Sequence, residues 1–281
     1  MNCTPQSRLL TELRTPILRS TRPELARDFY NGVLGDRATV LGTEQPGADE
    51  QTWGIILPAP AEAGSQWLPH AVSDDLASVQ ERVHDAGGTI CREAALFESM
   101  LVTAPDQSQI IITERAPGEP ALARELRVML ELCTREIDAS CGFYSRVLDL
   151  TQIPVPGDPY SYRVLFSNDI GIAGAVDMTT FFRETTVSHW IPYFQVDDIE
   201  RAVETSVAYG ARVTVPIDES FFDTRYATLT DPTGATFGMR EQPRVGGVFG
   251  SFSRVHGRFL SSEELAEQGE PGAIGAVGSE G

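Results

Sequence analysis

The segment WIPYFQVDDIERAVETSVAYGARV (190–213) decides the fold, because WLPHAVSDDLASVQERVHDAGGTI (67–90) carries the same pattern earlier in the chain. Each segment begins with an alternating strand and reaches a pair of aspartates, of which the second is suited to cap a following helix. Each helix ends at a glycine, Gly87 or Gly210, as a left-handed C-cap requires. An apolar strand follows, so both segments predict a strand, a helix and a strand in succession.

Two further pairs of segments recur in the same order. FYNGVLGD (29–36) returns as FYSRVLDL (143–150), in both cases at the end of an amphipathic helix. LVTAPDQSQIIITE (101–114) returns as TLTDPTGATFGMRE (228–241), and both read as β-hairpins around a proline-containing turn. The sequence therefore predicts an α+β fold of two tandem βαβββ modules, whose curved mixed sheets form cup-shaped cavities.

The recurring segments also predict the domain boundaries. The stretch RAPGEPALA reads as a linker because it is rich in proline and glycine, and the glycine-rich C-terminal end shows no strand pattern. The predicted divisions are a first module over 8–114, a linker over 115–123, a second module over 124–242 and an irregular or disordered tail over 243–281.

Composition excludes several classes of function. The net charge is −18, which argues against a nucleic-acid partner because phosphates would be repelled. All 22 basic residues are arginine, so Schiff-base lysines, pyridoxal-phosphate chemistry and P-loop lysines are excluded. No segment approaches 18 consecutive apolar residues and the N-terminal stretch is too polar for a secretory signal, so we expect a cytoplasmic protein without a membrane partner. The four cysteines are scattered, which disfavours disulfides and structural zinc.

The three recurring segments resemble the vicinal oxygen chelate superfamily, which includes glyoxalases, bleomycin-resistance proteins and extradiol dioxygenases. The resemblance covers roughly residues 8–242. Within the superfamily, the chain is similar to double-module proteins of actinomycetes. It implies that each module folds as βαβββ and that paired modules enclose a cup. It also implies that metal-dependent members carry His, Gln or Glu ligands on three strands of each module.

The positions that the resemblance assigns to those ligands carry poor donors in this chain. They are Thr15, Leu68 and Ile111 in the first module, and Met129, Ile191 and Gly238 in the second. A divalent ion needs several convergent nitrogen or oxygen donors. We therefore expect no metal and no organic cofactor, and extradiol cleavage or metal-assisted glyoxalase chemistry is disfavoured.

Polar residues near these positions form the predicted catalytic set. Residues two apart on a strand share a face, so His70, Glu131, His189 and Tyr193 are expected in the cup. Such groups suffice for acid–base catalysis without a metal. Alternatively, the histidines are hydrogen-bonded core residues, and Glu131 pairs with an arginine such as Arg127 to hold strands together.

Aromatic and polar side chains form the predicted ligand-binding set. Aromatic walls with a few polar groups are typical of a small-molecule site. For each tryptophan taken singly, ordinary core packing is the alternative. The segment 177–186, which includes Phe182, is either a lid or a dimer contact. The predicted ligand-binding residues are Trp53, Trp67, Gln109, Tyr160, Tyr162, Phe182, Trp190 and Arg240.

These features predict a metal-independent enzyme that binds an aromatic or polyketide-like secondary metabolite. The expected chemistry is proton transfer in a dehydration, cyclisation or isomerisation, as in a lyase, cyclase or isomerase of antibiotic biosynthesis. The alternative is a binding protein of the bleomycin-resistance type that sequesters an antibiotic or metabolite. Either a monomer or a homodimer is compatible with tandem modules.

Overall fold

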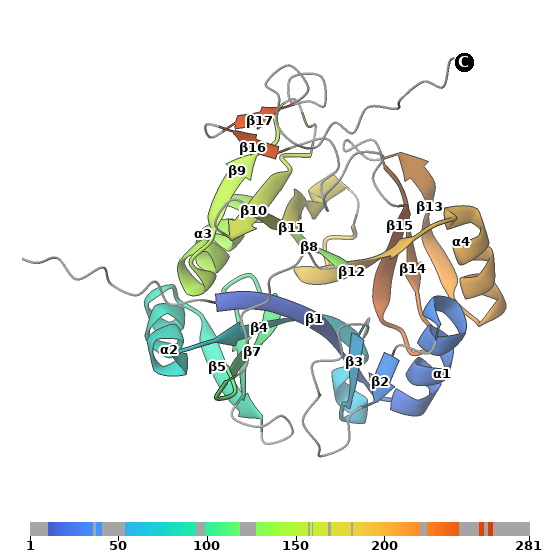
Figure 1. The fold of residues 1–281 in the computed structure, drawn as a ribbon, viewed down its shortest axis with the longest axis horizontal. Helices are drawn as coiled ribbons and strands as arrows, with labels where there is room; N and C mark the ends of the chain where they lie inside the picture. The colour runs from blue at the N-terminus through green and yellow to red at the C-terminus, as the bar shows by residue number, and fades with distance from the viewer. Residues whose placement is uncertain are drawn as a thin grey trace, which may run out of the picture.

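The computed structural model of the chain contains two curved β-sheets with helices packed on their flanks (Figure 1). The residues that it describes are 11–35, 38–40, 54–93, 99–118, 128–156, 158, 160–167, 170–180, 182–219, 224–241, 253–255 and 258–260.

The two halves of the chain contain similar series of helices and strands. The elements of the first half are β1 (Thr11–Ser20), α1 (Pro23–Leu34), β2 (Ala38–Val40), β3 (Gly54–Pro58), the short 3-10 helix η1 (Ala61–Ala63), β4 (Gln66–Ser73), α2 (Leu76–Asp85), β5 (Thr89–Glu93), β6 (Ser99–Thr103) and β7 (Gln109–Glu114). Those of the second half are β8 (Val128–Thr134), α3 (Ile137–Leu148), β9 (Thr151–Pro154), β10 (Arg163–Ser167), β11 (Ile170–Asp177), the short 3-10 helix η2 (Met178–Thr180), β12 (His189–Val196), α4 (Ile199–Ala208), β13 (Arg212–Glu219), β14 (Arg225–Thr230) and β15 (Thr236–Glu241).

Each half forms one sheet, and this confirms the predicted α+β fold of curved mixed sheets. The strand orders are β2-β3-β1-β4-β7-β6-β5 in the first half and β13-β14-β15-β12-β8-β11-β10-β9 in the second. At the centre of each sheet, β1 pairs antiparallel with β4, and β8 with β12. The expectation of one βαβββ unit per module was too coarse. Each half holds two strand–helix–strand units, and these meet side by side at the central pair.

The helix ends lie where the sequence predicts them. The Oδ1 atom of Asp75 accepts the N–H of Ser78 at 2.9 Å at the start of α2. Asp198 likewise caps α4 with a bond of 2.9 Å from the N–H of Arg201. The glycines that follow α2 and α4 have φ values of 80° and 98°, in the left-handed region that glycine adopts without strain.

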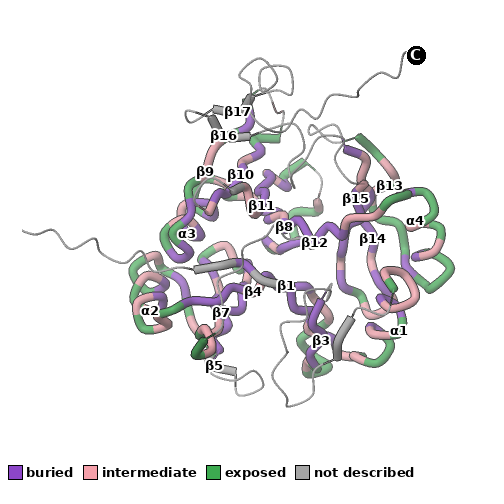
Figure 2. The backbone as a smooth tube through the Cα atoms, in the orientation of Figure 1, coloured by how far each residue is buried: buried purple, intermediate pink, exposed green. Residues whose placement is uncertain are grey.

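The two sheets lie back to back and bury their convex sides together with the helices (Figure 2). One shared core contains Val83 of α2 and Phe143 of α3, and the other contains Phe29 of α1, Ile199 of α4 and Phe237 of β15. Each core therefore contains residues from both halves of the chain. The concave sides face outward, in opposite directions (Figure 1).

A reciprocal set of hydrogen bonds joins the halves. The hydroxyl of Tyr30 on α1 donates to Oδ2 of Asp231 at 2.9 Å, in the turn between β14 and β15. In the opposite sense, the hydroxyl of Tyr144 on α3 bonds with Oγ of Ser108 at 2.8 Å, in the turn between β6 and β7. The tyrosine of each FYxxVL helix therefore reaches the hairpin turn of the other half.

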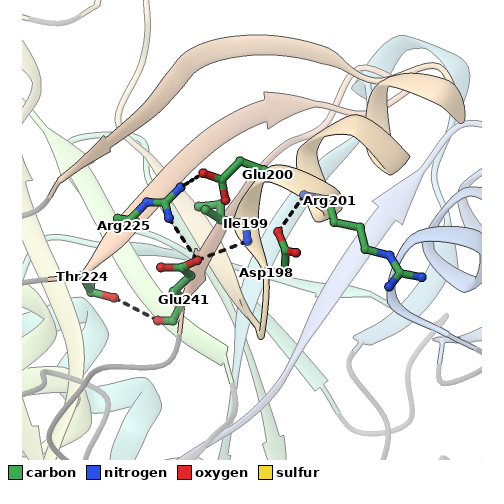
Figure 3. Close-up of polar contacts among 7 residues, drawn as sticks. All are labelled: Asp198, Ile199, Glu200, Arg201, Thr224, Arg225 and Glu241. Atoms are coloured by element: carbon green, nitrogen blue, oxygen red, sulfur yellow. Dashed lines mark hydrogen bonds and ion pairs between the residues drawn. The ribbon is translucent and has the colours of Figure 1, made fainter.

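The start of α4 is tied to the ends of β14 and β15 (Figure 3). The N–H of Ile199 donates to Oε1 of Glu241 at 3.4 Å, and Arg225 binds both Glu241 and Glu200. The hydroxyl of Thr224 donates to the carbonyl of Glu241 at 2.9 Å. These contacts fix the last strand of the second sheet relative to the helix behind it.

The C-terminal tail differs from its prediction in one short stretch. Residues 253–260 contain the strands β16 (Ser253–Val255) and β17 (Arg258–Leu260), which pair antiparallel, although the sequence predicts no strand there. The rest of the tail beyond Glu241 lies outside the described residues. Within the described part of the chain, no helix is long and apolar enough to span a membrane.

Candidate functional site

The concave side of the second sheet carries a buried polar group, which we call the Glu131 face. It is formed at the central strand pair by Met129, Glu131 and Cys133 of β8 and by Ile191 and Tyr193 of β12. In the antiparallel register Glu131 lies opposite Ile191, and Met129 lies opposite Tyr193. Alternate residues of these strands therefore share this face, as the sequence predicts.

Glu131 is the centre of this face. Its Oε2 atom accepts a hydrogen bond of 3.1 Å from the hydroxyl of Tyr162, and its Oε1 atom accepts one of 3.2 Å from Tyr193. Burial raises the pKa of Glu131, against the opposing effects of the two hydrogen bonds and of the Arg240 charge. Because the side chain is half-buried rather than fully enclosed, it is placed to exchange a proton with a bound molecule.

The two tyrosines act as donors toward this carboxylate. Burial raises the pKa of Tyr162 and of Tyr193 well above the ordinary value, and the neighbouring charge of Glu131 raises both further. Both phenols therefore keep their protons at neutral pH. The hydroxyl of Tyr193 also lies 3.3 Å from Oγ1 of Thr228 on β14, which extends the polar chain across the sheet.

Arg240 supplies the positive charge of this face. The residue lies on β15, is 4% exposed, and its Nη1 atom contacts Sδ of Met129 at 3.0 Å. Tyr226 lies opposite it in the β14–β15 register and packs edge-on to Tyr193, with ring centroids 6.1 Å apart. A carboxylate, a guanidinium and three phenols therefore line one side of the sheet.

His189 lies at the rim of the same face. Its Nδ1 atom donates to the carbonyl of Val187 at 2.9 Å, which leaves Nε2 as the basic nitrogen. Burial lowers the pKa of His189. The ring packs edge-on against Phe182 with centroids 5.1 Å apart, and the carbonyl of Phe182 accepts a bond of 3.2 Å from Arg135. The structure thus brings six predicted residues to one face, namely Glu131, Tyr162, Phe182, His189, Tyr193 and Arg240.

His70 and Gln109 lie elsewhere, on the concave side of the first sheet. The Nε2 atom of His70 lies 2.9 Å from Oγ1 of Thr113. Gln66 donates to Gln109 at 3.0 Å, and Gln109 donates to Thr103 at 3.0 Å. The floor between these groups is apolar and consists of Ile17, Ile55, Leu57, Leu68, Leu101 and Ile111.

The prediction that His70 shares a cup with Glu131 was therefore wrong. Strand alternation identified the concave side of each sheet correctly, but it contains no information on how two sheets face each other. Because the sheets pack back to back, their concave sides point apart (Figure 1). Gln109 is separated from Tyr162, Phe182 and Arg240 for the same reason.

Trp67 and Trp190 do not line either concave face. Both are 4% exposed and belong to the cores between the sheets, where each indole N–H donates to the tyrosine of its own half, Tyr30 at 2.9 Å or Tyr144 at 3.2 Å. Trp67 directly precedes Leu68, so alternation assigns the two residues to opposite sides. The alternative of core packing is the correct one for both tryptophans. Trp53 lies outside the described residues.

Tyr160 and Tyr162 differ in environment, although they are two residues apart. Both precede β10, and the backbone N–H groups of both donate to Oδ2 of Asp158 at 2.8 Å. Ser161 between them has a positive φ of 55°, so strand alternation does not apply. Tyr162 is 8% exposed and reaches Glu131, whereas Tyr160 is 42% exposed. Of these two predicted ligand-binding residues, Tyr162 therefore lies on the Glu131 face and Tyr160 does not contact Glu131 through an equivalent hydrogen bond.

Sequence reasoning missed two residues of the Glu131 face, Tyr226 and Thr228. They alternate on β14 and lie opposite Arg240 and Gly238 in the hairpin register. Extending the alternation from β15 across the predicted hairpin would have identified both of them.

The positions that the family resemblance assigns to metal ligands do not fit a divalent ion here. Met129 and Ile191 are apolar members of the Glu131 face, and Gly238 offers no side chain. Both oxygens of Glu131 are engaged by phenols. Among the described residues, no group of three or more His, Cys, Asp or Glu side chains is placed to hold a metal.

Comparison with known proteins agrees with this fold. Residues 127–239 match the family described as the Glyoxalase/Bleomycin resistance protein/Dioxygenase superfamily. The protein CFP32 of Mycobacterium bovis and of Mycobacterium tuberculosis, which bears the name of a glyoxylase, is 25% identical over 241 residues. That alignment covers 79% of this chain and 91% of CFP32.

Two solved structures share the fold at low sequence identity. The Mn(II)-bound glyoxalase from Novosphingobium aromaticivorans gives a TM-score of 0.55 at 15% identity, over 83% of this chain and 82% of that one. The 2,2',3-trihydroxybiphenyl 1,2-dioxygenase of Sphingomonas wittichii gives 0.55 at 14% identity, over 83% and 90%. The second half of the chain therefore matches the Glyoxalase/Bleomycin resistance protein/Dioxygenase superfamily, and the chain as a whole shares its fold with the solved glyoxalase and dioxygenase.

Proposed function

We propose that the Glu131 face is the active site of a metal-independent enzyme that transfers a proton on an aromatic or polyketide-like metabolite. The observation that carries the proposal is the arrangement around Glu131. Its carboxylate is half-buried, its two oxygens are held by separate phenols, and the Arg240 guanidinium lies two strands away on β15. A carboxylate held in this way resembles a general base rather than a surface charge.

The chemistry that suits these groups is abstraction of a proton from carbon next to a carbonyl. Glu131 takes the proton, and the electron pair moves onto the carbonyl oxygen. The charge that develops there is stabilised by the positive charge of Arg240. Return of the proton to another carbon gives an isomerisation. Loss of a hydroxyl group together with that proton, as water, gives a dehydration, and attack of the carbon on a second carbonyl gives a cyclisation.

The relatives support an enzyme in general terms. CFP32 bears the name of a glyoxylase, and the solved structures are named as a glyoxalase and a dioxygenase. The solved glyoxalase is named as Mn(II)-bound, whereas among the residues that the structure describes here no group of three or more His, Cys, Asp or Glu side chains could hold a metal, so the proposed chemistry uses the side chains alone.

The first test is hydrogen exchange of an aryl-substituted ketone in D2O. Phenylacetone is incubated with the protein, and the loss of its C–H signals is followed by NMR. We expect exchange above background with the wild type and a loss of at least about 100-fold in Glu131→Gln, because a positioned base contributes roughly 10²–10⁴-fold. Glu81→Gln, an exposed residue of α2, is the matched control and should exchange like the wild type.

A different outcome would favour sequestration. If phenylacetone and a panel of related aryl ketones bind, as judged by tyrosine fluorescence, but none exchanges, the proposed catalysis is wrong. Unchanged exchange in Glu131→Gln would also contradict it. Binding without turnover would favour the bleomycin-resistance type of function, in which the same aromatic and polar groups hold an antibiotic or metabolite.

A further inference from the structure

Two glycines lie beneath the tyrosines that hold Glu131. Gly174 on β11 is the register partner of Glu131 itself, and Gly238 on β15 is the register partner of Tyr193. A Cβ atom at Gly174 would lie 2.5 Å from Cζ of Tyr162, and one at Gly238 would lie 2.7 Å from Cγ of Tyr193. Both distances are shorter than real Cβ contacts, so any side chain at either position would overlap a ring.

Backbone conformation does not explain these glycines. Neither Gly174 nor Gly238 is among the glycines with positive φ, so their backbone suits any residue. Glycine within a strand generally weakens it, because there is no side chain to pack. What requires glycine at these two positions is the space above them, which the rings of Tyr162 and Tyr193 fill.

We propose that Gly174 and Gly238 are positioning residues of the active site, which act by seating Tyr162 and Tyr193 so that their hydroxyls hold the two oxygens of Glu131. The catalytic role of these glycines rests on the proposed function of Glu131. The placement of the two tyrosine rings rests on the distances alone. Tyr162 lies across β11 and Tyr193 across β15, so the two rings approach Glu131 from opposite sides of β8.

The seating has a consequence for the protonation of Glu131. The other charged or titratable groups that act on this carboxyl are Arg240, Asp158, Cys133 and Tyr226. Of these, Arg240 favours the ionised form and Asp158 opposes it, while burial opposes it most strongly. Removing a tyrosine hydrogen bond takes away one stabilising contact, so the pKa of Glu131 should rise further.

The test is a titration of Glu131 in the full chain, without any substrate. Carboxyl-labelled glutamate is incorporated, and the Glu131 signal is assigned by its absence in Glu131→Gln. We expect the midpoint to rise in Gly238→Ala and in Tyr193→Phe, and the double variant to rise no further than either single variant. The same comparison of two single variants and their double variant is made with Gly174→Ala and Tyr162→Phe. Gly142→Ala in α3 is the matched control, because the nearest atom to its Cβ lies at 3.8 Å.

In the exchange assay, the same variants should move the acid limb of the pH–rate profile upward. The rate at neutral pH should fall on the order of tenfold, because less of the base is ionised. An unmoved midpoint in Gly238→Ala, with a raised midpoint in Tyr193→Phe, would overturn the inference. If the titrations move as expected but Glu131→Gln still catalyses exchange, the seating is correct and the proposed function is wrong.

Failure to fold is also informative. Should Gly238→Ala not fold, Tyr193→Ala is added to remove the overlapping ring. Recovery of a cooperative unfolding transition in this double variant supports the seating. A double variant that remains unfolded shows that glycine is needed there for another reason, and this overturns the inference.

Discussion

At the scale of single residues, Glu131 illustrates a conflict between stability and function. Its pKa is raised by burial, so the folded state binds a proton more tightly than the unfolded chain does. The stability associated with this residue is therefore greatest below the unfolded value of about 4.3 and is lost as the pH rises through the raised folded pKa. A residue that destabilises the fold at neutral pH is typical of a functional site.

The first prediction at this scale is that Glu131→Gln stabilises the protein while it abolishes exchange. We expect the free energy of unfolding at pH 8 to rise by on the order of 1 kcal/mol, because a partly desolvated charge is removed. The gain should vanish below about pH 4, where the unfolded carboxyl is also protonated. Urea unfolding at several pH values measures it. A loss of stability at pH 8 would show that Glu131 holds the strands together instead.

At the scale of elements, the aspartate pairs position the helices behind each sheet. In both pairs the second aspartate is the N-cap, and its side chain accepts a backbone N–H three residues later at 2.9 Å. The start of α4 is further tied to the end of β15 through Glu241, close to Arg240 of the candidate site (Figure 3). These contacts hold the start of α4 against the end of β15, the strand that carries Arg240.

The prediction for this element is a difference between the two aspartates that precede α4. Asp198→Ala should lower the free energy of unfolding by about 1 kcal/mol, which is the usual cost of losing an N-cap. Asp197→Ala is the matched control, because Asp197 is exposed and should change stability by less than about 0.5 kcal/mol. Chemical denaturation of both variants measures the difference. Equal losses would mean that the cap contributes nothing beyond charge.

At the scale of the whole molecule, the two halves share their cores and are joined by buried polar bonds. Asp106, in the hairpin turn of the first half, accepts bonds from Thr134 at 2.9 Å and Ser140 at 2.6 Å in the second half. Burial alone would raise the pKa of Asp106, but its hydrogen bonds, above all those with Ser108 and Ser140, hold the pKa below its ordinary value. We therefore expect the halves to unfold together rather than as independent domains.

The corresponding prediction concerns the pH dependence of the stability that Asp106 contributes by joining the two halves. Because the folded pKa is lowered, the contribution of Asp106 is fully present above the unfolded value of about 3.9 and is lost as the pH falls toward the folded pKa. Asp106→Asn should lower the free energy of unfolding by roughly 1–3 kcal/mol at pH 7, with a smaller difference near pH 3. Asp85→Asn, an exposed residue of α2, serves as the control. A pH-independent loss would contradict the proposed role of the ionised carboxylate.

The sequence by itself determined the elements of this protein and the side of each strand that a residue occupies. Helix ends, hairpin turns and alternation are local properties, because they depend on backbone hydrogen bonds and on a period of two. This reasoning correctly placed Glu131 and Tyr193 on one face.

Only the tertiary structure decided which faces meet. Back-to-back packing separates His70 from Glu131, although strand alternation assigns each of them to the concave side of its sheet. The contact of Tyr162 with Glu131 depends on a turn with a positive φ at Ser161, and no periodic pattern contains that information. Sheet packing and turn geometry arise from contacts between residues distant in the sequence, and that is why the site emerged only in three dimensions.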